Sequence, residues 1–157
     1  MAEVLGVDFL DSDEEIVKAA NLTIPEIFAR DGEAFFRQKE TQILERLLEG
    51  QPCILSTGGG AYMADVNRNM ISEKAVALWL RADLDILWER VRHKDSRPLL
   101  RVADPKAKLA ALLNERAPYY AKAELMVDAE AELTLDQMTV KAVETLLANP
   151  VSGVAKD

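Results

Sequence analysis

The sequence predicts a single α/β domain in which a parallel sheet is flanked by helices. Short apolar runs without strict alternation are typical of strands that are buried on both faces, and amphipathic helical patterns separate these runs. A chain of 157 residues has the size of one domain and can bury a sizeable core. Because ligands of such sheets bind beyond the carboxyl ends of the strands, the residues that follow each strand are the candidate site.

The predicted strands are residues 7–10, 53–56, 75–80 and 124–127. Residues 1–6 resemble the last turns of a helix that ends at Gly6. No strand precedes this helix, so we expect that a segment is missing upstream. The expected sheet is therefore N-terminally truncated.

Capping patterns mark where helices begin. Ser12 with Glu15, and Thr23 with Glu26, each form the spacing of a capping box, and Gly32 is expected to end the second of these helices. Further helices are predicted for residues 33–49, 84–92, 106–116 and 134–147.

Composition narrows the class of protein. The formal net charge of −8 argues against nucleic acid or an anionic membrane as the main partner. The lone Cys53 cannot form an internal disulfide, and the N-terminus lacks an export signal. The apolar runs are shorter than the roughly 20 residues that cross a bilayer. We expect a cytoplasmic protein.

Asp11 and Asp13 lie two residues apart where the first strand meets a helix. Both carboxylates can face a ligand there; one can ligate magnesium, and one can accept a proton from a substrate hydroxyl. Helix capping and compensation of the helix dipole are the alternative interpretation.

The sequence TGGG places Gly58, Gly59 and Gly60 directly after the second strand. Glycines permit positive φ angles and close approach of a ligand to the backbone; a tight turn without a ligand is the alternative. The ATP-binding pattern G-x-x-x-x-G-K-[ST] occurs nowhere in these residues. The loop therefore predicts another ligand.

Two arginines are candidates for binding a carboxylate. Arg37 lies on a helix with Glu40 three residues on, and Arg116 lies where we expect Pro118 to end a helix. Planar guanidinium groups suit a substrate carboxylate, although each arginine could instead form a surface ion pair. Both alternatives stay open from the residues alone.

Residues 92–101, RHKDSRPLLR, are a basic stretch between two predicted helices. Such a stretch could be a lid that brings Arg97 over phosphate groups. A solvated loop is the alternative, and His93 is expected to be a surface residue of that lid.

The order of these motifs is more specific than any one of them: DSD, GEAFFR, TGGG, RPLL and NERAPYY. Over residues 5–127 the chain resembles the shikimate kinase family. The resemblance implies a P-loop, nucleoside-monophosphate-kinase-like fold with three α/β/α layers, and one domain over residues 1–157 with a lid at about 93–103. It also implies transfer of a phosphoryl group from MgATP to the 3-hydroxyl of shikimate, a step of aromatic amino acid biosynthesis.

The resemblance also implies roles for the candidate residues. Asp13 would hold the substrate hydroxyls and assist deprotonation, and Gly59 would bond shikimate through its backbone in a loop shaped by Gly58 and Gly60. Arg37 and Arg116 would clamp the shikimate carboxylate. On the nucleotide side, Asp11 would order Mg2+ through water and Arg97 would contact the phosphates of ATP.

One departure from the family leaves alternatives open. The family's Walker A loop and leading strand should precede residues 1–6, so we expect a truncated sequence that does not transfer phosphate as written. A non-catalytic protein that binds shikimate or a partner is the first alternative, and a related kinase, such as one acting on gluconate, is the second. We expect a monomer when the chain is complete, whereas exposed sheet edges would favour association.

Overall fold

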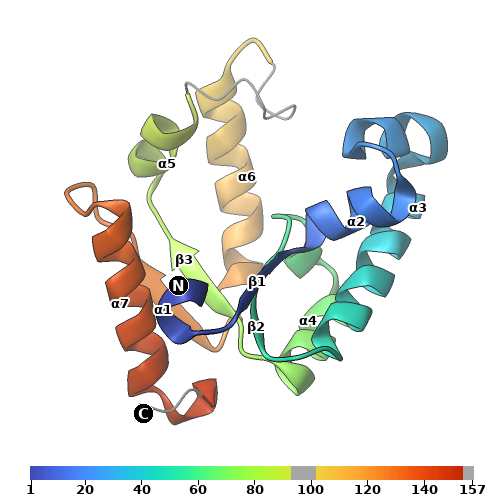
Figure 1. The fold of residues 1–157 in the computed structure, drawn as a ribbon. Coiled ribbons are helices and arrows are strands. Elements are labelled where there is room, and N and C mark those ends of the chain that lie inside the picture. Colours follow the sequence, from blue (N-terminus) through green and yellow to red (C-terminus); the bar gives the residue numbers. More distant parts are fainter. Residues whose placement is uncertain (93–101, 154–157) are drawn as a thin grey trace. The chain divides into compact units, whose positions relative to one another are not determined.

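The computed structural model describes residues 1–92 and 102–153. The chain forms two compact units, Met1–Val76 and Ala77–Asp157. Each unit contains one pair of parallel strands with helices packed beside it. The element order is drawn in Figure 1.

The first unit begins with one helical turn and a short strand. Its elements are α1 (Ala2–Leu5), β1 (Asp8–Asp11), α2 (Ser12–Ala20), α3 (Ile24–Leu48), β2 (Cys53–Ser56), the 3-10 turn η1 (Ala61–Met63) and α4 (Asp65–Lys74). Strands β1 and β2 are parallel, and Asp11 is paired with Ser56. The carboxyl ends of both strands therefore meet at one edge, as predicted.

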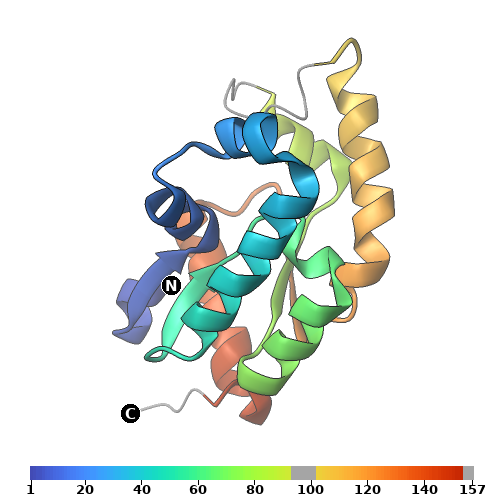
Figure 2. The same ribbon diagram turned by 90° about the vertical axis from the view of Figure 1, so that its right-hand side faces the viewer.

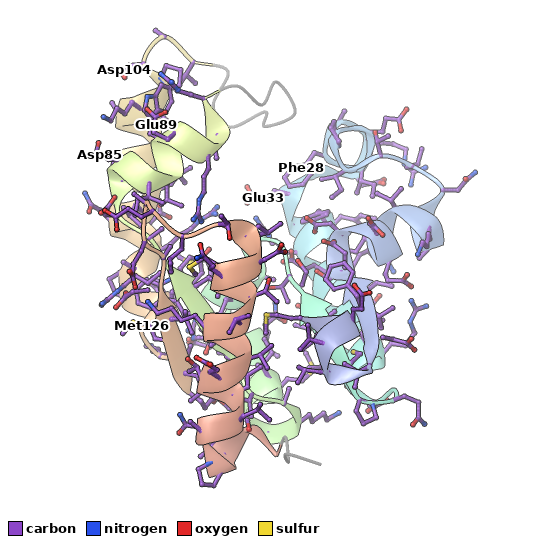
Figure 3. All side chains as sticks on the ribbon, turned by 60° about the vertical axis from the view of Figure 1, so that its left-hand side comes forward. Phe28, Glu33, Asp85, Glu89, Asp104 and Met126 are labelled. Atoms are coloured by element: carbon purple, nitrogen blue, oxygen red, sulfur yellow. The ribbon has the colours of Figure 1, made fainter. Side chains whose placement is uncertain are left out.

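Helices α2 and α3 enclose the core of this unit. Ile16, Ile27 and Phe36 are buried together, and the rings of Phe28 (labelled in Figure 3) and Phe36 lie 4.7 Å apart. Leu44, which follows Phe36 by about two turns on the same face of α3, is fully buried. This packing holds the start of α2 against the middle of α3.

The second unit repeats the strand and helix pattern. Its elements are β3 (Leu78–Arg81), α5 (Leu84–Val91), α6 (Pro105–Tyr120), β4 (Leu125–Asp128), α7 (Leu135–Ala148) and the 3-10 turn η3 (Pro150–Ser152). Strand β3 is parallel to β4, and α7 packs on β4 through Ala142, Val143 and Leu146. Lys106 of α6 pairs with Asp85 of α5 at 2.9 Å, and Asp85 is labelled in Figure 3.

Several local predictions are confirmed. Gly6 ends α1 in the left-handed conformation, with φ of 66°, and the capping box of Thr23 and Glu26 opens α3. Gly32 interrupts α3 with φ of 83° and ψ of 171°, which is not helical. The predicted stop at this glycine is therefore real, although the chain resumes a helix at once.

Other local predictions are wrong. The cap of α2 is Asp11 and not Ser12, because the carboxylate of Asp11 accepts the backbone N–H groups of Asp13 and Glu14. Pro118 does not end a helix: α6 continues to Tyr120. A proline in the last turn costs one backbone hydrogen bond, which the surrounding helix tolerates. Helix α4 was not expected, because residues 65–74 are mostly polar.

Candidate functional site

The first part of the candidate site is the junction of β1 and α2. Asp11 Oδ1 accepts hydrogen bonds from the backbone N–H of Asp13 at 2.9 Å and of Glu14 at 3.3 Å. This cap fixes the first turn of α2 at the end of the strand. Helix capping, the alternative interpretation for this pair, is therefore a role of Asp11.

Asp13 is half-buried and lies against the glycine loop. A Cβ atom on Gly58 would lie 2.9 Å from Asp13 Oδ1. That oxygen is buried and has no hydrogen-bond partner within the described part of the chain. Burial raises the pKa of the Asp13 carboxyl, the negative charge of Asp11 raises it further, and the positive charge of Arg37 lowers it.

Arg37 is held in place by its own helix. Its Nη1 donates to Glu40 Oε1 at 2.9 Å, its Nη2 lies 3.6 Å from a carboxylate oxygen of Glu33, and its guanidinium lies over the ring of Phe36. Glu40 is only 2% exposed, and burial raises the pKa of its carboxyl, against the opposing effect of Arg37. A buried carboxylate therefore anchors a half-exposed cation.

The glycine loop passes between these two side chains. Cβ atoms on Gly58 and Gly60 would meet Asp13 and Arg37 respectively, at distances below normal contact. Gly59 between them is exposed. Two of the chain's own side chains approach the loop closely, so the approach of a ligand to this backbone stays a prediction. None of the three glycines has a positive φ.

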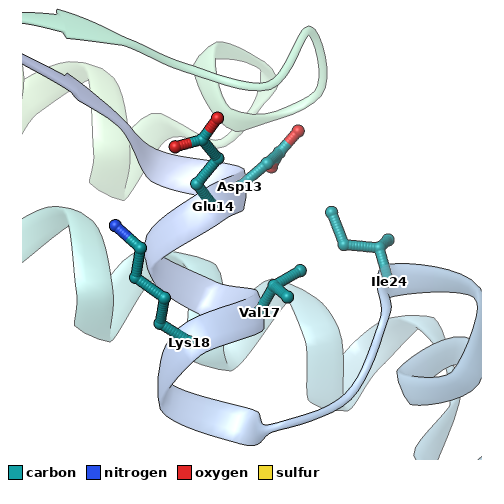
Figure 4. A pocket seen from close by; sticks show the side chains of 5 residues that line it. All are labelled: Asp13, Glu14, Val17, Lys18 and Ile24. Atoms are coloured by element: carbon teal, nitrogen blue, oxygen red, sulfur yellow. The ribbon is translucent and has the colours of Figure 1, made fainter.

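A pocket of about 340 Å³ opens beside Asp13 (Figure 4). Asp13 and Glu14 come from the first turn of α2, Val17 and Lys18 from the second, and Ile24 from the start of α3. The lining therefore combines carboxylates with aliphatic side chains, a composition that suits a small ligand with both polar and apolar faces. Val17 and Ile24 were not predicted, since aliphatic residues on a helix usually signal only core.

The remaining predicted residues lie elsewhere in the chain. Arg116 is half-buried on α6 in the second unit. Arg97, with residues 93–101 of the predicted lid, lies outside the described residues. The structure thus brings together Asp11, Asp13, Arg37 and the glycine loop, all within the first unit.

Two general features of the described residues bear on ligands. Residues 1–92 and 102–153 hold no group of three or more histidine, cysteine or acidic side chains arranged to bind a metal ion. The same residues include no helix with the length and apolar character needed to span a membrane.

Comparison with known proteins decides the family. The sequence model of the family described as shikimate kinase matches residues 1–147. The chain belongs to the shikimate kinase family. The predicted resemblance and the predicted P-loop kinase-like α/β class are confirmed.

Shikimate kinases from several bacteria are similar over most of the chain. The protein named shikimate kinase from Ruegeria pomeroyi is 58% identical over 146 residues, which are 93% of this chain and 75% of that protein. The shikimate kinase from Cereibacter sphaeroides is 60% identical over 150 residues, 96% of this chain and 75% of that protein. The solved structure of the Acinetobacter baumannii shikimate kinase in complex with shikimate is 33% identical. It has a TM-score of 0.84 and covers 94% of this chain and 82% of its own.

Proposed function

We propose that this shikimate kinase family member transfers the γ-phosphoryl group of ATP to the 3-hydroxyl of shikimate. The observation that carries the proposal is the arrangement of Asp13 and Arg37 on either side of the glycine loop. A carboxylate and a guanidinium there can bind the two kinds of polar group that shikimate carries, its hydroxyls and its carboxylate. The aliphatic wall of Val17 and Ile24 suits the ring carbons.

Arg37 binds the substrate carboxylate in this proposal. Glu40 accepts from Nη1 of Arg37 and so fixes the orientation of the guanidinium, whereas Nη2 lies 3.6 Å from the exposed Glu33, a more distant partner that a substrate carboxylate can replace. An oriented guanidinium binds a carboxylate through paired, charge-assisted hydrogen bonds. The roles of Arg116 as a second cation for the carboxylate, and of the Gly59 backbone toward the substrate, stay predictions from the resemblance.

Asp13 orients the hydroxyl that reacts and accepts its proton. Its Oδ1 lacks a partner among the described residues, so a substrate hydroxyl can donate to it. A raised pKa makes the carboxylate a stronger base. The Asp13 carboxylate would accept the hydroxyl proton as the substrate oxygen forms its bond to the γ-phosphorus and the bond from that phosphorus to ADP breaks, so that ADP is the leaving group.

ATP supplies the phosphoryl group when it is bound, and Mg2+ neutralises its phosphates. Asp11 would fit a role toward Mg2+, because both of its described hydrogen bonds are accepted by Oδ1, and Oδ2 would be the oxygen that binds a magnesium-bound water. Mg2+ commonly uses one or two carboxylates, with waters and phosphates as its other ligands. The lid at residues 93–103 and the contact of Arg97 with ATP stay predictions. So do a single kinase domain over residues 1–157, a monomeric state and a cytoplasmic location.

The test is calorimetric binding of shikimate to the 157-residue chain, together with shikimate-dependent formation of ADP by the same chain joined at its N-terminus to a Walker A segment of the family, because residues 1–157 hold no Walker A pattern. Binding with ADP formation supports the proposal. Binding without ADP formation would support the alternative of a non-catalytic shikimate-binding protein. Phosphorylation of gluconate in place of shikimate would contradict the choice of substrate.

A further inference from the structure

A buried polar network lies directly behind the glycine loop. The side chain of Asn67, in the first turn of α4, is only 1% exposed. Its Oδ1 accepts a hydrogen bond from Thr41 Oγ1 of α3 at 2.8 Å, and its Nδ2 donates to the carbonyl of Ala61 in η1 at 2.8 Å. Asn67 therefore joins three elements, and α3 and α4 run beside each other in Figure 2.

The network continues into the loop through the backbone of η1. The N–H of Ala61 donates to the carbonyl of Gly58 at 3.0 Å, and the N–H of Met63 donates to the carbonyl of Gly60 at 3.2 Å. Ala61, whose carbonyl accepts a hydrogen bond from Asn67, thus itself donates one to Gly58. Any shift of Ala61 is transmitted to the loop.

Arg68 makes a second connection of the same kind. It is 6% exposed and donates from Nη1 to the carbonyl of Tyr62 at 2.6 Å. Its Nη2 also bonds Asp65, and its guanidinium lies over the ring of Tyr62. Consecutive carbonyls of η1 are therefore bound by consecutive side chains of α4.

Helix α3 positions both Arg37 and, through Thr41, the glycine loop. Thr41, which binds Asn67, lies one helical turn after Arg37 and next to Glu40. The helix that presents the guanidinium thus also fixes, through Asn67 and Ala61, the loop against which that guanidinium lies. Only a small displacement is tolerated, because Gly60 and Arg37 are already in close contact.

We propose that Asn67 is a positioning residue, which fixes the glycine loop relative to Arg37 and so sets the affinity for shikimate without contacting it. The effect on shikimate rests on the proposed function, whereas the effect on the loop does not. The hydrogen bonds of a buried side-chain amide are costly to break, because the groups that bonded to it then stay buried without a partner.

Three variants of the 157-residue chain test the proposal. Asn67→Asp keeps the size and the acceptor for Thr41 but sets a second oxygen against the carbonyl of Ala61. Thr41→Val is a milder change that removes only the hydroxyl, so it tests the same network if Asn67→Asp does not fold. Ile71→Val, also buried on α4, is the matched control, because it removes a methylene without touching the network.

Two measurements separate positioning from stability. Hydrogen exchange by NMR reports the opening of the Ala61 and Met63 amides without any ligand, and calorimetry reports the shikimate dissociation constant. We expect Asn67→Asp to speed exchange at both amides and to weaken binding, each by about tenfold, as for loss of one buried hydrogen bond. Ile71→Val should change exchange only as far as it changes global stability, and should leave the dissociation constant unchanged.

The outcomes are distinct. Exchange at Ala61 that is unchanged in both Asn67→Asp and Thr41→Val, or changed no more than in Ile71→Val, overturns the proposal. Faster exchange with an unchanged dissociation constant overturns the role toward the substrate. If the wild-type chain bound no shikimate, the proposed function would be contradicted, and the exchange rates would still decide whether Asn67 holds the loop.

Discussion

The guanidinium of Arg37 lies so close to the backbone of Gly60 that a methyl group on this glycine would come within 2.5 Å of Nη2. The conformation of Gly60, with φ of −88° and ψ of −16°, is open to any residue. The position of Arg37, and not the backbone conformation, therefore favours glycine here. On the other side of the loop, Gly58 stands in the same relation to Asp13.

Gly60→Ala should weaken shikimate binding. The added methyl displaces the end of Arg37, a flexible side chain, so the free energy of unfolding should change little. Loss of a charge-assisted contact costs about 1.5–3 kcal/mol, or roughly 10- to 100-fold in affinity. Calorimetry checks this, with Gly50→Ala as a control at a glycine outside the loop. Equal affinity of Gly60→Ala and wild type would contradict the proposed contact.

Substitutions at Arg37 and Asp13 should differ in kind. Arg37→Ala should act mainly through binding and raise KM for shikimate, because it removes contacts made in the ground state and the transition state alike. Asp13→Asn keeps the shape of the side chain but removes the base, so it should lower kcat by about 100-fold or more. Steady-state kinetics with varied shikimate, measured on both variants in the chain joined to a Walker A segment, separate the two. Wild-type affinity for shikimate in Arg37→Ala would exclude the clamp.

The pKa of Asp13 should respond to its two charged neighbours in opposite directions. Asp11→Asn keeps a capping side chain but removes a negative charge, so the pKa of Asp13 should fall toward its usual value. Arg37→Ala removes a positive charge and should raise it. Carboxyl carbon NMR titration measures both shifts. In wild type, shikimate binding should weaken on acidification at a pH above the usual aspartate pKa, as Asp13 becomes protonated.

Glu40→Gln should make stability less dependent on pH. Folding raises the pKa of Glu40, so its ionised form is disfavoured in the folded state, and wild type loses stability as pH rises through that pKa. The variant has no such loss. Its free energy of unfolding relative to wild type should therefore increase from pH 4 to pH 8, as urea titrations would show.

Glu26→Gln is the matched comparison for this pH dependence. The backbone and hydroxyl of Thr23 lower the pKa of Glu26, so its contribution to stability is present above the unfolded pKa and is lost as pH falls. The variant should be less stable than wild type near pH 7 and equal to it in acid. The same sign of pH dependence for Glu40→Gln and Glu26→Gln would contradict the assigned shifts.

The first turn of α2 offers a test of which residue caps it. Ser12→Ala should leave stability unchanged or slightly higher, because the Ser12 hydroxyl is buried without a partner within the described residues. Asp11→Ala should cost about 1 kcal/mol, through loss of the cap. Thermal unfolding of the two variants decides between them. A greater loss in Ser12→Ala would restore Ser12 as the cap.

Local signals in the sequence were sufficient for much of the fold. The capping box at Thr23, the left-handed Gly6 and the break at Gly32 follow from interactions within a few residues. The α2 cap shows the limit of such signals. Ser12 and Asp11 are both good capping residues. A cap needs an extended backbone conformation, and the end of β1 determines that Asp11 is the residue that has it.

The sequence by itself determined the family, the α/β class and the candidate residues Asp13, Arg37 and Gly58 to Gly60, because motif order and strand ends are local properties of the chain. Only the tertiary structure showed which side chains a Cβ atom on Gly58 or Gly60 would meet. Asp13 and Arg37 reach the loop from two different helices, and the hydrogen bonds of Asn67 join residues 26 and 6 positions apart. Such distances in space depend on packing between elements, which no spacing within a single element can specify.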